Sequence, residues 1–396
     1  MAAVAGGSPR LGRGLLLLMS VAICATASNL YYNQPLLPLI RQAFDLHEGV
    51  VGLVPAASQF GYALAILLIS PLGDTIPRRT LIGVLSVVLS LALVAIVLAP
   101  SFPVLILACF VVGLGGNITQ QLIPFGASLA TPETRGQVIA TLMTGLSIGL
   151  LLSRTISGTV AEYFGWRGVF LGAAIVAIVF GVLFQIVLPR NVPSVTLGYR
   201  ALLGSMVQLV RRHRLLRQTA LTGALWFAAF NALWATLAIH LNTGPFFYSA
   251  QQAGLFGLVG LAGILGARVS GRLVGVVGAR ALITGALVLI IAAFGVMAIW
   301  GDTLGGMILG VVLLDLGVFG AQIPNQVRVF SIDPDAQSRI YAVYMLCYYS
   351  AAALGSAAGV KVMSLAGWHG LTTFGIGLGV AAGLYHLSTR RTEDAA

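Results

Sequence analysis

The stretch Gly73-Asp-Thr-Ile-Pro-Arg-Arg-Thr-Leu-Ile-Gly83 recurs 202 residues later as Gly275-Val-Val-Gly-Ala-Arg-Ala-Leu-Ile-Thr-Gly285. The two segments share a glycine at each end, and Arg78 and Arg280 stand at the same internal position. A basic loop that repeats between long apolar runs indicates a membrane protein made of two similar halves.

The same register continues along the chain on both sides of this stretch. Most of each half is apolar, so a match of Leu to Val carries little information, whereas Asn, Pro and Trp rarely coincide by chance. Three further pairs keep the spacing of 202 residues: Asn29 with Asn231, Pro132 with Pro334, and Gly165-Trp166 with Gly367-Trp368.

The composition excludes a large soluble protein. Hydrophobic residues make up 58% of the chain and charged residues only 8%, whereas a soluble domain carries about 25% charged residues. The 49 glycines and 15 prolines suit close-packed helices in lipid. The net charge of +11 comes from arginines in short loops between apolar runs, with Lys361 as the one lysine. This pattern indicates orientation in a membrane and argues against nucleic-acid binding.

About twelve apolar stretches are long enough to cross a bilayer as helices of roughly 20 residues. They cover 14–40, 49–70, 80–100, 104–130, 137–163, 168–189, 218–241, 250–273, 281–300, 304–328, 340–364 and 370–388. We therefore expect an all-α membrane protein with 12 transmembrane helices in two pseudo-symmetric six-helix bundles. The bundles are residues 1–189 and 218–396, joined by a basic cytoplasmic linker at 190–217.

The arginines also predict the orientation in the membrane. With the N-terminus inside, nearly all of them fall in cytoplasmic segments, and only Arg41, Arg167 and Lys361 fall on the opposite side. Cytoplasmic loops carry an excess of basic residues, so both termini are expected in the cytoplasm of a multi-pass protein of the cell's inner membrane. The first apolar run is too long for a cleavable signal peptide.

The loop from Ser70 to Arg79 resembles the signature loop of the major facilitator superfamily, Gly-x-Leu-x-Asp-x-x-Gly-Arg-Arg. The match lies at Leu72, Asp74, Arg78 and Arg79, while serine and proline replace the two glycines. The resemblance implies the twelve-helix fold of that superfamily. It also implies that Asp74, Arg78 and Arg79 form an inner gate that latches the two halves together.

Three further segments resemble the drug–proton antiporter branch of the superfamily. They are Asn33-Gln34-Pro35-Leu-Leu-Pro38, Gly165-Trp166-Arg167-Gly-Val-Phe170, and the antiporter-like Gly149-Leu-Leu-Leu-Ser-Arg-Thr-Ile-Ser-Gly158. In the last segment Arg154 replaces the branch's proline, and the fourth span lacks its buried arginine. The resemblance implies proton-driven export, and these two departures leave the coupling mechanism open.

Two charged residues, Arg154 and Asp315, lie deep inside predicted spans rather than near their ends. A charge at the bilayer centre costs roughly 2.5–3.5 kcal/mol on insertion scales, so such residues serve a function or find a partner. Asp315 in the tenth span is the candidate for proton coupling, with a structural carboxylate tied to Arg154 or to a helix end as the alternative. Arg154 in the fifth span is a candidate to hold an anionic substrate, to neutralise Asp315 or to lock the halves.

Amide and aromatic side chains gather on the first, fourth, seventh and tenth spans, which line the central cavity in the superfamily that the chain resembles. Because lipid cannot satisfy an amide, these faces are expected to look inward. Hydrogen bonding that merely joins helices is the alternative. The candidates for the substrate cavity, with Gln59 of the second span, are Asn29, Tyr32, Asn33, Asn117, Gln120, Gln121, Trp226, Phe230, Asn231, Trp234, Gln322, Asn325 and Gln326.

Ridges of glycine occur on three other spans. Small residues at intervals of three or four let helices approach closely and slide, so we expect these ridges to form the rocking contacts between the halves. Their members are Gly145, Gly149, Gly254, Gly257, Gly260, Gly263, Gly266, Gly355 and Gly359.

Several functional classes lack their sequence requirements. The chain has no phosphate-binding Gly-rich loop followed by Lys-Ser/Thr, no metal-ligand cluster and no nucleophile–base arrangement. Its three cysteines, Cys24, Cys109 and Cys347, lie in apolar segments. We therefore expect no enzyme, no cofactor and no metal.

The function that these features favour is secondary active transport of a small organic molecule or drug, by proton-coupled efflux and alternating access. The first rival is a symporter or facilitated carrier of a polar metabolite such as a sugar or an organic anion. The second is a non-transporting membrane receptor. The expected partners are the small-molecule substrate, protons and the lipid bilayer, and the chain is expected to act as a monomer.

Overall fold

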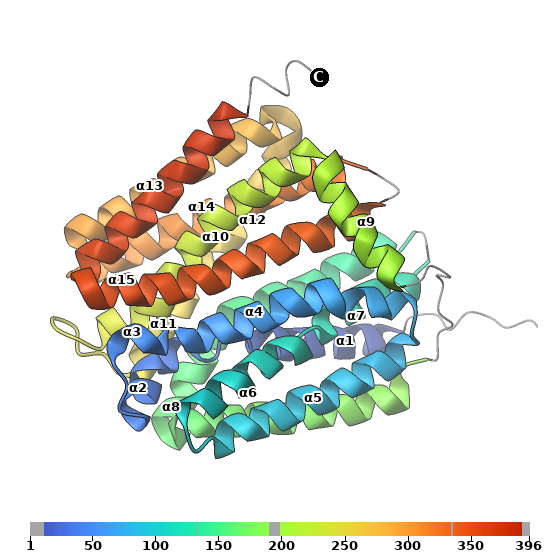
Figure 1. Cartoon of the computed structure of the whole chain (residues 1–396), viewed down its shortest axis with the longest axis horizontal. Coiled ribbons are helices and arrows are strands. Elements are labelled where there is room, and N and C mark those ends of the chain that lie inside the picture. Colours follow the sequence, from blue (N-terminus) through green and yellow to red (C-terminus); the bar gives the residue numbers. More distant parts are fainter. Residues whose placement is uncertain (1–11, 132, 190–198, 334–335, 390–396) are drawn as a thin grey trace, which may run out of the picture.

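The computed structural model describes residues 12–131, 133–189, 199–333 and 336–389, without the side chains of Asp74, Arg200, Ala201 and Leu202. All regular elements in these ranges are helices (Figure 1). Those before the linker are α1 (Arg13–Ser28), η1 (Gln34–Leu36), α2 (Leu37–Ala43), α3 (Glu48–Val51), α4 (Leu53–Leu68), η2 (Ser70–Asp74), α5 (Arg78–Leu98), α6 (Phe102–Gly115), α7 (Ile118–Ser128) and α8 (Arg135–Val187). After the linker helix α9 (Tyr199–Arg212) come α10 (Arg214–Leu241), α11 (Ala250–Val259), α12 (Ala262–Val277), α13 (Ala279–Trp300), α14 (Leu304–Phe330) and α15 (Gln337–Ser388).

The two longest helices, α8 and α15, each reverse direction at one glycine. Gly165 has φ 68° and ψ 169°, and Gly367 has φ 62° and ψ −161°, a region of backbone space that is essentially restricted to glycine. After the reversal, the second arm of α8 runs antiparallel to α5. Arg167 bonds to the carbonyl of Val97 at one end, and Gln185 bonds to that of Arg79 at the other.

The two reversals stand 202 residues apart, as the repeat predicts. They also define the two ends of the molecule. We call the end with Gly165 and Gly367 the hairpin end, and the opposite end, which carries α9, the linker end (Figure 1).

Four predicted spans that we expected to be continuous are broken, among them 49–70, which divides into α3 and α4 at Gly52. The span 14–40 stops at Ser28 and resumes at Gln34, because Pro35 lacks the N–H that a helix needs and its ring clashes with the preceding turn. The span 104–130 divides into α6 and α7, and 250–273 into α11 and α12. Glycines, which are poor helix formers, stand at both of these breaks, at Gly116 and Gly260.

Nine helices in the described ranges are long and apolar enough to cross a membrane, and α1 is a shorter apolar helix. Their outward surfaces are also apolar. Large hydrophobic side chains such as Leu91, Ile186 and Leu354 are about two-thirds exposed or more, which a protein surrounded by water does not tolerate over so much of its surface.

The helices form two groups that lie side by side in Figure 1, α1–α8 as the N-terminal half and α10–α15 as the C-terminal half. Between the halves, α4 and α3 pack against α15, the first arm of α8 packs against α11, and α10 packs against η1 and α2. Near the hairpin end, a Cβ on Gly52 would lie 2.7 Å from that of Val360. The described contacts between the halves run from the middle of the molecule to this end.

The expectation that the glycine ridges join the halves is correct only for Gly254 and Gly257, which pack against Arg154 and Leu151 of α8. The remaining members pack helices within one half: Gly145 and Gly149 on α1, Gly355 and Gly359 on α10, Gly263 and Gly266 on α14, and Gly260 beside Asp315 and Trp234. Close packing by small residues is needed inside a bundle as much as between bundles. The spacing of the glycines therefore does not show which helix they pack against.

Candidate functional site

Arg154 lies in the first arm of α8 at the boundary between the halves and is 2% exposed. Its Nε donates to Oε1 of Gln34 at 2.7 Å, and Nη1 donates to the carbonyl of Leu150 at 3.2 Å. The guanidinium carbon lies 3.8 Å from the ring centroid of Trp234, on α10 of the other half, and 5.2 Å from that of Tyr31. Nη2 has no hydrogen-bond partner. The arginine is therefore held by two nitrogens and by a cation–π contact across the boundary, with one donor left over.

Asp315 lies on α14 of the opposite half and is fully buried. Neither of its carboxylate oxygens has a hydrogen-bond partner, and no ion pair joins it to Arg154. Gly260, at the break between α11 and α12, makes the necessary room. A Cβ there would lie 3.2 Å from Oδ1 of Asp315 and 3.3 Å from the Trp234 ring. Trp234 thus borders both the cation of one half and the carboxylate of the other.

A buried hydrogen-bond network joins the halves through the amide of Gln59 on α4. Its Nε2 donates to Oδ1 of Asn231 on α10 at 2.6 Å, and its Oε1 accepts from Oγ of Ser356 on α15 at 3.0 Å. The network continues where Asn231 donates to the carbonyl of Phe227 at 2.9 Å. All the side chains in it are fully buried, so both ends of one amide hold the two halves together. We call this the Gln59 clamp.

The substitution Gln59→Leu should weaken this closure. It removes both hydrogen bonds between the halves and leaves a buried amide acceptor unpaired on Asn231, which together shift the equilibrium toward opening by about tenfold. Double electron–electron resonance between spin labels at Tyr163 and Leu365 checks this. Both positions are exposed, near the hairpin end and on opposite halves, and the labels belong on a chain whose three native cysteines are replaced.

The matched control is Gln120→Leu, which breaks the 2.9 Å bond from Gln120 to the hydroxyl of Tyr62 within the N-terminal half. It should leave the distance distribution unchanged, whereas Gln59→Leu should add a longer distance. Identical distributions for both variants and the unaltered chain would show that the Gln59 clamp does not hold the halves closed.

Aromatic side chains surround this region, and several of them were not among the predicted site residues. Phe227 stacks on Tyr348 with ring centroids 3.7 Å apart, and Tyr62 meets Tyr349 edge-on at 4.6 Å across the halves. The tyrosines of α15 had a signal in the sequence, because Tyr341, Tyr344, Tyr348 and Tyr349 fall at helical spacing on one face. Tyr31, Gln34, Tyr62 and Ser356 were also missed, and nothing in their spacing marks them.

The amides of the fourth span lie elsewhere than predicted. Asn117 donates to Oγ of Ser70 at 2.8 Å, and Gln121 donates to Oδ1 of Asn117 at 2.9 Å and to the carbonyl of Ser70 at 3.4 Å. Both therefore hold η2 within the N-terminal half, as interhelical hydrogen bonds that join helices. Gln120 is half-buried against Tyr62 and stands closer to the boundary.

The predicted residues of the first and tenth spans divide between several places. Asn33 donates to Oγ of Ser58 at 3.3 Å, and Asn325 donates to the carbonyl of Thr219 at 3.0 Å, each within one half. The other placements are as follows: Gln322 and Gln326 are half-buried, Trp226 and Phe230 are fully buried, and Asn29 and Tyr32 line a pocket inside the N-terminal half.

The inner-gate residues are described only in part, because the side chain of Asp74 lies outside the described part of the structure. Arg78 donates to the carbonyl of Gln121 at 3.3 Å, and Arg79 donates to those of Leu188, at 3.1 Å, and Gln185. These bonds all stay within the N-terminal half. The latch between the halves remains a prediction.

Among the described residues, no group of three or more His, Cys, Asp or Glu side chains is placed to hold a metal ion. Polar atoms without partners near the boundary instead include Nη2 of Arg154, the carboxylate of Asp315 and the indole N–H of Trp234. Donors, an acceptor and an aromatic ring of this kind are suited to hydrogen bonding and stacking with an organic molecule.

The sequence pattern of the Major Facilitator Superfamily matches residues 17–356. The chain is 36% identical over 367 residues to the uncharacterized transporter YgaY of Escherichia coli O157:H7, covering 92% of this chain and 93% of that protein. It is 28% identical over 345 residues to the probable sugar efflux transporter of Pasteurella multocida (strain Pm70), covering 86% and 82%.

The fold resembles the crystal structure of a bacterial homolog to the human lysosomal transporter Spinster, in an inward-facing and occupied conformation. The TM-score is 0.79 at 16% sequence identity, and the superposition covers 98% of each chain. At that identity the likeness concerns the fold alone. The expected all-helical major facilitator fold is thereby confirmed.

Apolar helices, a buried polar site between two halves and transporter relatives point to one class of protein. The chain is a multi-pass membrane transporter for a small molecule and not an enzyme, and it belongs to the Major Facilitator Superfamily.

Proposed function

We propose that the chain exports a small organic molecule or drug in exchange for protons, by alternating access between residues 1–189 and residues 218–396. One observation carries the proposal: Asp315 is fully buried without a hydrogen bond, beside Trp234, which the Arg154 guanidinium of the other half covers. A buried ionisable group in a membrane protein is a functional site by default.

The proposed coupling follows from the change in the surroundings of Asp315 when the halves open and close. When the halves separate, water reaches the carboxyl group and it can exchange its proton. When they close on Trp234, a fully buried ionised carboxylate is costly, so closure favours a bound proton or a bound substrate. Arg154 cannot carry protons, because a guanidinium stays charged. Asp315 therefore binds the proton. The fixed positive charge of Arg154 interacts with the charge of the group that lies opposite it.

The proposed topology has twelve passes, because each arm of α8 and α15 counts as one and α1 continues through η1 and α2. The distribution of arginines supports a cytoplasmic linker end, with both termini on that side of the inner membrane. The described arginines toward that end are Arg13, Arg78, Arg79, Arg135, Arg211, Arg212, Arg214, Arg217, Arg268, Arg272, Arg280, Arg328 and Arg339. With the linker end in the cytoplasm, the hairpin end faces the opposite side of the membrane. The halves contact each other as far as the hairpin end, so this arrangement corresponds to an inward-facing state of a monomer.

A second candidate is a symporter or facilitated carrier of a polar metabolite, such as a sugar or an organic anion. The free Nη2 donor of Arg154 favours an anion, since guanidinium groups bind carboxylates with matched geometry. The name of the Pasteurella multocida relative, a probable sugar efflux transporter, supports a sugar and also supports export.

Transport by the purified protein in liposomes tests these alternatives. A thermal-shift screen of metabolites and drugs first identifies a substrate. Antiport predicts uptake into liposomes that are acidic inside, symport predicts uptake when the outside is acidic, and facilitated diffusion predicts no response to either gradient. A protonophore should abolish the response. Uptake that ignores the pH gradient would refute proton coupling.

A further inference from the structure

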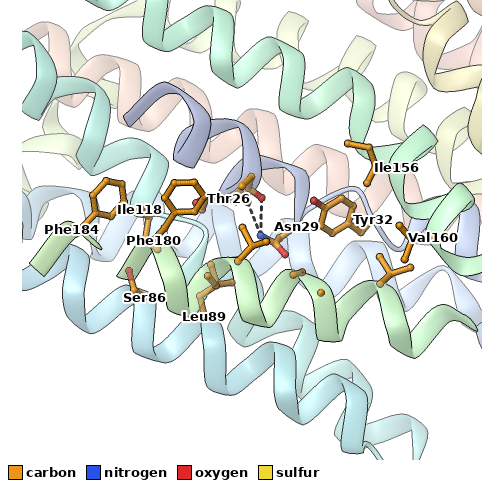
Figure 2. A pocket seen from close by; sticks show the side chains of 16 residues that line it. Thr26, Asn29, Tyr32, Ser86, Leu89, Ile118, Ile156, Val160, Phe180 and Phe184 are labelled. Atoms are coloured by element: carbon orange, nitrogen blue, oxygen red, sulfur yellow. Dashed lines mark hydrogen bonds between the residues drawn. The ribbon is translucent and has the colours of Figure 1, made fainter. Parts of the chain in front are cut away.

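The N-terminal half contains a pocket of about 200 Å³, separate from the boundary between the halves (Figure 2). It is enclosed by α1, α5, α7 and both arms of α8. Ile156 and Val160, on the first arm of α8, face it from the side of that helix that lies away from Arg154. The pocket therefore does not belong to the site already described.

The mouth of the pocket opens on the lipid-facing surface. Gly172, on the second arm of α8, is exposed, and a Cβ added to it would meet no atom within 4 Å. The neighbouring pocket residues Ile156 and Val176 are 45% and 41% exposed. Because these residues lie within long apolar helices, a molecule reaches the mouth from the bilayer, so it must partition into lipid.

Of the residues that line the pocket, Asn29 contributes a buried polar atom without a hydrogen-bond partner, the carbonyl oxygen of its side chain. Asn29 is 4% exposed, and its Nδ2 donates to the carbonyls of Ala25 at 3.0 Å and Thr26 at 3.3 Å. These two acceptors fix the orientation of the amide, since the flipped form would bring three oxygens together. Oδ1 is left without a partner and is directed into the pocket (Figure 2). A buried acceptor without a partner calls for a donor on the ligand.

The remaining walls are mostly apolar and aromatic, with hydroxyl groups on Thr26, Tyr32 and Ser86. Phe180 and Phe184 stand at one end, with ring centroids 6.0 Å apart, and the hydroxyl of Ser86 already donates to the carbonyl of Ile82 at 2.8 Å. An apolar cavity of about 150 Å³ takes up benzene, so this pocket suits one substituted ring. Its chemistry excludes charged ligands, because no side chain of opposite charge lines it.

From these features we infer that the pocket is a second ligand site, reached from the bilayer, for a small neutral ring compound with one hydroxyl group, such as a phenol. The hydroxyl donates to Oδ1 of Asn29, and the ring packs against Phe180 and Phe184. Asn29 stands at the start of the break in the first span, five residues before Gln34, which holds Arg154. A ligand bound in this pocket therefore acts on the segment from Asn29 to Gln34, which positions Arg154.

Photolabelling tests the inference without requiring transport. The probe is a phenol that carries a diazirine, applied to the full chain in liposomes, and mass spectrometry identifies the labelled residues. Labels are expected on the second arm of α8 between Gly172 and Phe184. p-Cresol should compete about fivefold better than 4-methylanisole, its methyl ether, which lacks the donor but has similar bulk.

Two variants sharpen the test. Gly172→Leu should close the mouth and abolish labelling, and its Cβ meets no neighbour within 4 Å. Gly285→Leu, at an exposed glycine of α13 that also has open space, should leave labelling intact. Asn29→Leu should keep the label but remove the preference for p-cresol over its ether.

Labelling that persists in Gly172→Leu, or that falls outside the pocket, would overturn the inference. Equal competition by p-cresol and 4-methylanisole in the unaltered chain would also overturn it, because the pocket would then be an apolar space for lipid chains that does not select a hydroxyl group.

Discussion

Liposomes that contain Asp315→Asn should fail to accumulate substrate in response to a pH gradient. With one proton exchanged per substrate, one pH unit supplies about 1.4 kcal/mol, so the unaltered chain reaches about a tenfold concentration ratio and the variant reaches none. Asparagine has nearly the same size as aspartate but cannot bind and release a proton. Asp315 makes no short hydrogen bond, so the substitution changes only a long polar contact with the Trp234 indole.

Counterflow provides the internal control for this variant. Exchange of labelled for unlabelled substrate at equal pH requires a folded protein that alternates between its two states, but it needs no net proton movement. Asp315→Asn should therefore retain exchange while it loses accumulation, and Asp315→Glu should retain part of both. Full accumulation by Asp315→Asn would refute the assignment of Asp315 as the coupling group.

Replacement of Arg154 by glutamine should weaken the binding of anionic substrates far more than that of neutral ones. A hydrogen bond to a charged group contributes about 1.5–3 kcal/mol, which corresponds to a loss of about 10- to 150-fold in affinity. The free Nη2 donor and the fixed Nε bond to Gln34 are the features that make Arg154 a receptor for a carboxylate. The measurement compares the dissociation constants of a carboxylate substrate and of its uncharged amide.

Arg154→Lys is the matched variant for this comparison. It keeps the positive charge, but it loses the planar group that lies 3.8 Å from the centre of the Trp234 ring and the bond to Gln34. Binding of the carboxylate should be intermediate between that of the unaltered chain and that of Arg154→Gln. If both variants lose affinity for the carboxylate and for its amide equally, Arg154 has an architectural role, in which it joins the halves through Trp234.

Much of the fold was predictable because it depends on local patterns. The repeat of 202 residues identifies Gly165 and Gly367 as equivalent, and both adopt the same glycine-only conformation in which a helix reverses. Apolar runs bounded by arginines locate the long helices to within a few residues. The breaks at Asn29–Asn33, Gly116 and Gly260 were missed, because apolarity alone does not distinguish a continuous helix from an interrupted one.

The site was predictable in its chemistry and less so in its geometry. Charges inside apolar spans identify Arg154 and Asp315, since few residues of this kind tolerate lipid. The amides were grouped together by helical spacing, yet Asn117 holds η2, Asn325 stays within its half and Asn29 faces a different pocket. Spacing predicts which residues share a face of a helix, but it does not predict what that face meets.

The sequence alone determines the membrane class, the two homologous halves and the two charged residues that lipid cannot accept. Each of these features depends on composition or on the spacing of residues along the chain. The partners of those residues follow from packing: the Trp234 ring on Arg154, the Gln59 clamp, and the space at Gly260 for Asp315. These contacts join segments that lie 55 to 297 residues apart. The packing of helices against one another determines such contacts, and the residue pattern of a single helix does not predict that packing.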